Sequence, residues 1–303
     1  MFLRRFITCL PIIGFSAFVF IAWNYFDHEK IWLYLKLADL WLIIVVILLT
    51  STQILTATLR YNYFLKACGA KIKINDCMHA VLTALSINSV VPGKGGDIAK
   101  AIVLTKDKQD IIKYTGVTII EKLCDLIVLA IITFLGAFLA ENNFWKLVSL
   151  ASIILFLSLF LSLRFIDKFP ILGYKLKILP ELLIIAFKNP KFFLIGIFFC
   201  ILLWVVNLTI IFLLLMSVDA GVSLSKIISY WPSSMLTGML PVTISGFGTR
   251  DVAFHYALGE SLSNTRLFAG TFLYTVFVYW FLSLLAFIIL GVKGIQNCTT
   301  HDC

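Results

Sequence analysis

The stretch VVPGKGGDIAKAIVL, residues 90–104, holds residue types that could bind an anion inside an otherwise apolar part of the chain. Glycines let the backbone turn so that its N–H groups converge, and a helix that restarts near Asp97 would direct its positive end to the same point. Lys94 adds a full positive charge. The pattern predicts an anion site. The alternative is a tight turn with Lys94 extending to the membrane surface.

A second stretch, LPVTISGFGTRD at residues 240–251, has a similar composition. Pro92 and Pro241 lie 149 residues apart, and each closes an apolar segment. Asp97 and Asp251 follow them at a spacing of 154. Similar chemistry at a nearly constant spacing indicates an internal duplication with a half-length near 150 residues.

Eight charged residues fall within or beside apolar segments. A charge near the bilayer centre costs about 3 kcal/mol, so such side chains face the protein interior and pair with one another. Glu121 and Asp125 share a helix face, and Lys122 can reach Asp125. Arg250 could hold a phosphate through two parallel hydrogen bonds. A self-neutralising structural network without a ligand is the alternative. The eight are Lys94, Lys100, Lys122, Arg250, Asp97, Glu121, Asp125 and Asp251.

The composition defines the class of protein. Of 303 residues, 61% are hydrophobic and 14% are charged, and the mean hydropathy is +1.00. A soluble core of this size cannot bury so much apolar surface, so we predict an all-α polytopic membrane protein forming a single integral domain over residues 1–303. We expect no soluble catalytic domain and no nucleic-acid partner, despite the net charge of +9. The seven cysteines and four histidines lack metal-ligand spacing, so we expect no metal and no cofactor.

Six segments are long and apolar enough to cross a bilayer, and two more are apolar but broken. The broken ones cover residues 76–104 and 225–258, and the two stretches quoted above interrupt them. The six continuous spans are predicted at residues 6–26, 37–59, 113–140, 145–166, 192–216 and 267–291.

The loop charges favour re-entry of both broken segments over full crossing. If both re-enter, 16 Lys and Arg residues lie on one side and 5 on the other; if both cross, the split is 9 against 12. Cytoplasmic loops carry the excess of basic residues. We therefore predict that both termini are cytoplasmic, and that residues 1–143 and 144–303 form inverted repeats of three spans and one re-entrant hairpin each. The basic segment 168–191 is predicted to lie along the cytoplasmic surface or to form a simple loop.

Three motifs resemble those of the lysylphosphatidylglycerol synthase transmembrane-region family. They are N-x-x-x-P-G-x-G-G-D at residues 88–97, E-K-x-x-D at 121–125 and L-P-x-x-x-x-G-x-G-x-R-D at 240–251. The family includes the flippase domain of the multiple peptide resistance factor, and the resemblance implies transfer of a lipid with a charged or glycosylated head group between leaflets. Lys122 and Asp251 stand where arginine and glutamate are more usual in the family. The synthase's soluble aminoacyl-transferase domain has no counterpart, so we do not expect this chain to make the lipid.

The resemblance and the charge pattern together give one set of candidate head-group-binding residues. By position, the resemblance implies roles for the prolines, glycines and charged residues of the three motifs. The neighbouring basic and amide side chains complete the set. It comprises Asn88, Pro92, Gly93, Lys94, Gly95, Gly96, Asp97, Lys100, Glu121, Lys122, Asp125, Pro241, Gly246, Gly248, Arg250 and Asp251.

These observations predict a lipid translocase of the cytoplasmic membrane, acting on an anionic or phosphate-linked lipid. A charged head group cannot cross hydrocarbon unaided at a useful rate, and a polar path lowers that barrier. No ATP-binding motif is present in the sequence, which favours downhill, ion-coupled or partner-driven movement. The alternatives are a membrane-embedded transferase acting on lipid-linked substrates, and a scaffold for a partner lipid synthase or glycosyltransferase.

Overall fold

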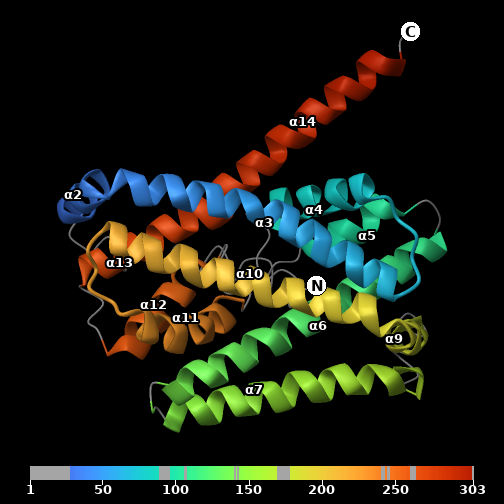
Figure 1. Ribbon diagram of the computed structural model, residues 1–303, viewed down its shortest axis with the longest axis horizontal. Coiled ribbons are helices and arrows are strands. Elements are labelled where there is room, and N and C mark those ends of the chain that lie inside the picture. Colours follow the sequence, from blue (N-terminus) through green and yellow to red (C-terminus); the bar gives the residue numbers. More distant parts are fainter. Residues whose placement is uncertain are drawn as a thin grey trace, which may run out of the picture.

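The computed structural model describes residues 28–88, 96–105, 108–139, 141, 143–168, 178–239, 243, 246–259 and 264–301. Every secondary-structure element within these ranges is a helix, and most of the helices run side by side in an elongated bundle (Figure 1). The predicted span at residues 6–26 lies outside the described residues, as do Pro92, Gly93, Lys94, Gly95 and Pro241.

Five helical segments are long and apolar enough to cross a bilayer within the described ranges, which confirms a multi-pass helical membrane protein. A helix of 28 residues is about 42 Å long, more than the roughly 30 Å of the hydrocarbon core. The five coincide with five of the predicted spans. They are α3 (Leu40–Ala67), α6 (Lys108–Leu139), α7 (Asn143–Ser162), α10 (Pro190–Ser217), and a continuous run of α13 (Thr265–Tyr274), π-helical η4 (Thr275–Phe281) and α14 (Leu282–His301).

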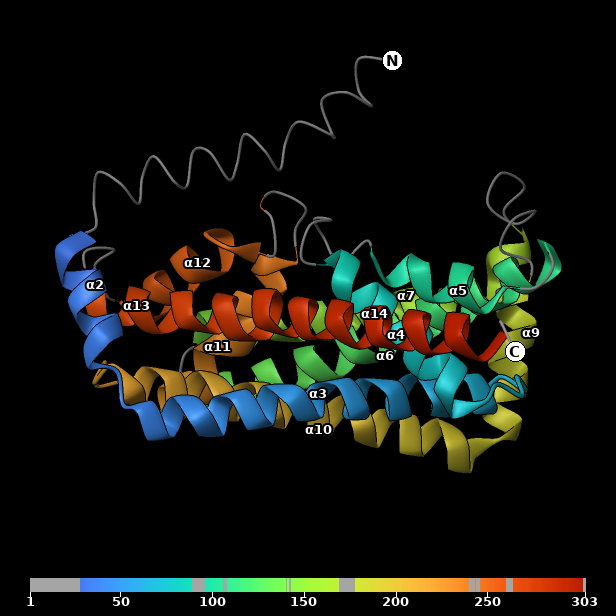
Figure 2. The ribbon, with the colours of Figure 1, turned by 90° about the horizontal axis from the view of Figure 1, so that it is seen from above.

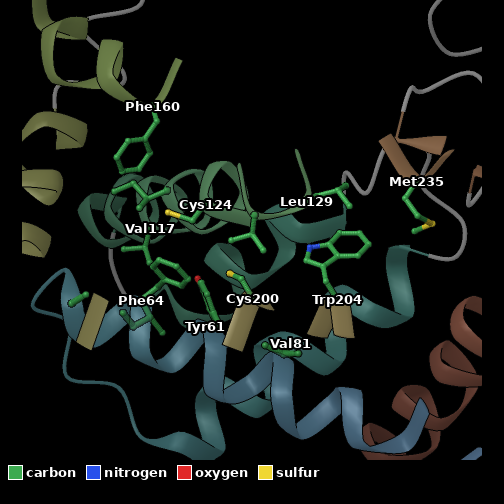
Figure 3. Packing of buried hydrophobic residues seen from close by; sticks show 14 of the residues in the cluster. Tyr61, Phe64, Val81, Val117, Cys124, Leu129, Phe160, Cys200, Trp204 and Met235 are labelled. Carbon is green, nitrogen blue, oxygen red and sulfur yellow. The ribbon is translucent and has the colours of Figure 1, made fainter. Parts of the chain in front are cut away.

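Helices α3 and α10 form an antiparallel pair that runs along one side of the bundle in Figure 2. The backbone N–H of Asp39 donates to the carbonyl of Ser217 at 3.0 Å, which joins the start of α3 to the end of α10. At the other end, Asn189 Nδ2 donates to the carbonyl of Ala67 at 3.2 Å. Buried side chains of this pair meet those of α6 in the main hydrophobic core (Figure 3).

The two broken segments each form a pair of short helices packed on one another. Helix α4 (Ile74–Asn88) contacts α5 (Ile98–Leu104), and α11 (Leu224–Gly238) contacts α12 (Thr249–Leu258). The longer helix of each pair has 15 residues and is therefore about 22 Å long, too short to cross the hydrocarbon core.

Glycine permits a close approach within each pair. A Cβ on Gly96 would lie 2.7 Å from Oδ1 of Asn88, and a Cβ on Gly246 would lie 2.7 Å from the carbonyl oxygen of Gly238. Gly246 also has a φ of +69°, in the left-handed region. The second helix pair therefore requires glycine at position 246 for both steric and conformational reasons.

We expect Gly246→Ala to destabilise the protein more than Gly221→Ala does. Gly221 has nearly the same φ, +68°, but no atom within 4 Å of an added Cβ, so its substitution isolates the conformational cost of about 1 kcal/mol. Gly246→Ala adds the clash with Gly238. Thermal unfolding of the two variants in detergent measures the difference. Equal melting temperatures would contradict the close approach.

Corresponding features of the two halves recur at a constant spacing of 150 residues. The turn after α3 contains Gly69 at φ +73°, and the turn after α10 contains Asp219 at φ +51°. Each is followed by a backbone N–H bonded to a carbonyl five residues earlier, from Ala70 at 2.8 Å and from Ala220 at 2.9 Å. The next helices start at Ile74 and Leu224. The close approaches of Gly96 and Gly246 follow the same spacing.

The two ends of the bundle carry different short helices, and both ends carry basic residues. Helix α2 (His28–Leu37) lies at one end, while α9 (Ile178–Lys188) lies at the other and runs across the ends of α3 and α10 (Figures 1 and 2). The segment predicted as either a surface helix or a loop therefore contains a helix. The end with α9 carries Lys66, Lys71, Lys73, Arg164, Lys188 and Lys191, and the end with α2 carries Lys30, Lys36, Lys146, Lys226 and Arg266.

Candidate functional site

A cavity with one charged wall lies where the helix pair α4–α5 meets α3, α6 and α10. It holds about 900 Å³ of space, including the part open to the outside, and α3, α4, α5, α6, α10, α11, α13, η4 and α14 contribute to its walls. One region of the wall is charged, and the rest is mainly apolar or aromatic. Asn88, Asp97, Lys100, Lys122 and Asp125 of the predicted set line it.

The centre of the charged wall is Arg60, which joins two acids of α6. Its Nε donates to Glu121 Oε1 at 2.8 Å, and its Nη1 donates to Asp125 Oδ1 at 2.8 Å. The indole Nε1 of Trp204 on α10 donates to the same Asp125 oxygen at 3.1 Å. All four side chains are buried, so the network connects α3, α6 and α10 through charge-assisted bonds inside the bundle.

Two lysines extend the network toward the start of α5. Lys100 Nζ lies 3.0 Å from Glu121 Oε2 and 3.3 Å from Asp97 Oδ1. Lys122 Nζ lies 2.6 Å from Asp97 Oδ2, and Asn88 Nδ2 donates to Asp97 Oδ1 at 3.2 Å. Lys122 therefore pairs with Asp97 across the cavity, whereas the sequence predicted pairing with Asp125 on the same helix. Its side chain is 26% exposed, compared with 5% for Lys100.

Arg60 is a charged residue of the cavity wall that the sequence analysis did not place in the candidate site. It was counted among the cytoplasmic loop residues because the span was predicted to end at residue 59. Helix α3 continues to Ala67 and buries Arg60 at 7% exposure, so that assignment was wrong. The spacing of Gln53, Ala57 and Arg60 is the signal that could have found it. Positions i, i+4 and i+7 share a helix face, and all three residues line the cavity.

Arg250 occupies a second buried site, outside the cavity lining. Its side chain is fully buried, and its Nη2 lies 2.9 Å from Asp251 Oδ1 and 2.6 Å from Thr275 Oγ1. The guanidinium carbon lies 5.3 Å from the ring centre of Trp231, 4.9 Å from that of Tyr274 and 5.8 Å from that of Tyr279. Both tyrosines also line the cavity, so they lie between it and Arg250.

The remaining predicted residues of this half shape the start of α12. Gly248 precedes the helix with a φ of +96°, and its N–H donates to Asp251 Oδ2 at 2.8 Å. Asp251 thus caps the helix with one oxygen and pairs with Arg250 through the other. By the 150-residue spacing, Arg250 corresponds to Lys100, and Thr271 and Thr275 correspond to Glu121 and Asp125. In the second half, Arg250 is therefore paired with its sequence neighbour Asp251, whereas Lys100 in the first half pairs with Glu121 of another helix.

The fold and the site together define a class: a multi-pass helical membrane protein with two broken helix pairs and a charged cavity among its spans. The sequence matches the family described as "Lysylphosphatidylglycerol synthase TM region" over residues 9–286. Because the match covers most of the chain, the protein belongs to that family, which confirms the resemblance carried by the three motifs. A search of curated proteins finds no matching sequence.

Proposed function

We propose that the protein is a lipid translocase that moves an anionic or phosphate-linked lipid between the leaflets of the cytoplasmic membrane. The observation that carries this proposal is the cavity wall on which Arg60, Lys100 and Lys122 gather among apolar surfaces. Charges placed within membrane spans are expensive, and they commonly mark a substrate path. The membrane-protein class and the family match support a lipid-related role.

In the proposed cycle, the lysines exchange a protein carboxylate for a lipid phosphate. Lys122 is the most exposed basic residue of the network, and its Nζ forms an ion pair with Asp97 Oδ2 at 2.6 Å. Asp97 keeps contacts with Lys100 and Asn88 if Lys122 turns toward a ligand. A phosphate oxygen can thus replace Asp97 at Lys122 without leaving the carboxylate unpaired. The apolar part of the wall accepts the adjoining lipid chains.

We further propose that both broken helix pairs re-enter the membrane from opposite sides, as inverted repeats. The antiparallel α3 and α10, the short helices and the 150-residue spacing support this arrangement. The end that carries α9 would face the cytoplasm, as the positive-inside rule predicts from the loop charges of the sequence. In this arrangement Arg250 lies toward the outer side and forms a second binding site for the lipid head group. The head group reaches it after Tyr274 and Tyr279 move.

Reconstitution of purified protein into liposomes tests this function directly. Labelled anionic and zwitterionic phospholipids are placed in the inner leaflet, and their appearance outside is followed by quenching. We expect transbilayer movement in protein-containing vesicles without chemical change of the lipid. Chemical turnover would support the transferase alternative instead, and neither movement nor turnover would support a scaffold for a partner synthase.

We expect Lys122→Gln to lower lipid transport roughly tenfold or more, because a charge-assisted bond to phosphate is lost. The melting temperature should change little, because Asp97 keeps two other partners. Lys113→Gln on the same helix is the control, since Lys113 does not line the cavity. Equal transport by the two variants would remove Lys122 from the proposed path.

A further inference from the structure

A second groove lies at the end of the molecule that carries α9, and it shares no lining residue with the central cavity. It is formed between the end of α7 with the adjoining 3₁₀ helix η2 (Leu163–Lys168) and the transverse helix α9. The groove holds about 770 Å³ of space, including its open part. Its walls are Phe160, Leu161, Leu183, Ile184 and Phe187, with Arg164 and Lys188 as its two charged residues.

Helix α9 has two apolar faces with different surroundings. One face is buried, and Leu182 packs so closely on α6 that a Cβ on Gly116 would lie 2.7 Å from its Cδ1. The other face leaves Ile184 46% and Phe187 57% exposed. A helix that lies across the ends of the spans with exposed apolar side chains and basic neighbours has the character of a membrane-interface helix.

The chemistry of the groove selects one kind of occupant. The rings of Phe160 and Phe187 meet edge to face, with centroids 6.4 Å apart, and give a continuous apolar wall for an acyl chain. Arg164 and Lys188 are exposed and supply positive charge for a phosphate. None of the described residues that line the groove is acidic. This combination matches an anionic phospholipid, whose charge lies at the level of the interface while its chains lie deeper.

We propose that this groove binds one anionic phospholipid of the surrounding leaflet, at a site separate from the transport cavity. The acyl chain lies along Phe160, Leu183 and Phe187, and the phosphate lies between Arg164 and Lys188. Bound lipid holds α9 against the ends of α3 and α6, with which α9 is in contact. The site acts on the stability of the bundle, so it does not depend on lipid translocation.

The test measures binding of dioleoylphosphatidylglycerol, with dioleoylphosphatidylcholine as the neutral comparison, to purified protein in detergent. Native mass spectrometry counts the bound lipid, and thermal unfolding follows stabilisation. We expect saturable binding of the anionic lipid and an accompanying rise in melting temperature. Arg164→Ala/Lys188→Ala should weaken binding roughly 30-fold and abolish the rise. Because both side chains are exposed, the variant should fold without added lipid.

Lys71→Ala/Lys73→Ala is the matched control, because it removes the same charge from the same end outside the groove. It should bind the anionic lipid like the wild type, and so should the charge-preserving Arg164→Lys/Lys188→Arg. Equal weakening in the Lys71/Lys73 variant would mean diffuse attraction and would overturn the site. Equal stabilisation by the neutral lipid would overturn it as well. Loss of transport with lipid binding intact would count against the proposed function only.

Discussion

Replacing Arg60 with methionine is expected to destabilise the protein by about 3–5 kcal/mol, because it leaves buried carboxylates without their main partner. Arg60 contacts both Glu121 and Asp125 at 2.8 Å, and these acids are 1% and 3% exposed. Glu121 keeps Lys100, and Asp125 keeps the neutral indole of Trp204, which does not balance its charge. We expect a large loss of folded protein and a lower melting temperature in detergent. Arg266→Met, at an exposed pair with Asp219, should remain close to wild type.

A double variant separates charge balance from other effects of losing Arg60. Arg60→Met/Asp125→Asn removes one positive and one negative charge, and Glu121 stays paired with Lys100 at 3.0 Å. Replacing a whole buried pair is far less costly than removing one partner, so most of the stability should return. Transport should stay low, because the cavity wall loses one of its three basic residues. Stability that stays as low as in the single variant would show that Arg60 acts through packing instead.

The sequence was sufficient to predict the five spans that the described residues contain, because burial in lipid requires long apolar runs whatever their partners. The sequence also predicted the two broken segments, because glycine and proline interrupt helices locally. The pairing within the charged network was less predictable. Lys122 lies three residues before Asp125 on one helix, yet it bonds to Asp97 from another segment. Whether Lys122 pairs with Asp97 or with Asp125 depends on the distance between α5 and α6. The spacing of residues along one helix does not determine that distance.

The helix end at Ala67 shows the same limit. An arginine after a long apolar run predicts the start of a loop, because most arginines in that position lie in loops. Here two acids of α6 neutralise Arg60, so the helix continues for seven more residues. The spacing between the two halves that was inferred from Asp97 and Asp251 was also only approximate. Asp97 precedes α5, whereas Asp251 is the third residue of α12, so these aspartates occupy different helical positions despite their similar surroundings in the sequence.

Gly136→Ala is expected to destabilise the contact between α6 and α11 strongly. A Cβ at Gly136 would clash with the carbonyl oxygen of Ile228 and would lie 2.7 Å from Cα of Ser229. Both obstacles are backbone atoms, so no side chain can rotate to make room. Close helix contacts through small residues are a main source of packing energy within membranes. The cost should reach or exceed the upper end of the roughly 1–3 kcal/mol that overpacking usually brings.

The same substitution should also lower transport in whatever folded protein remains. Helix α11 carries Trp231, which lies against the Arg250 guanidinium, and Met235, which lines the cavity, so a shift of α11 disturbs both sites. Gly291→Ala is the control, because it makes the same change in α14 with no atom within 4 Å of the added Cβ. That variant should match the wild type or be slightly more stable, since alanine favours helix over glycine. Similar melting temperatures and transport rates for the two variants would contradict the close backbone approach and the link from α6 through α11 to the cavity.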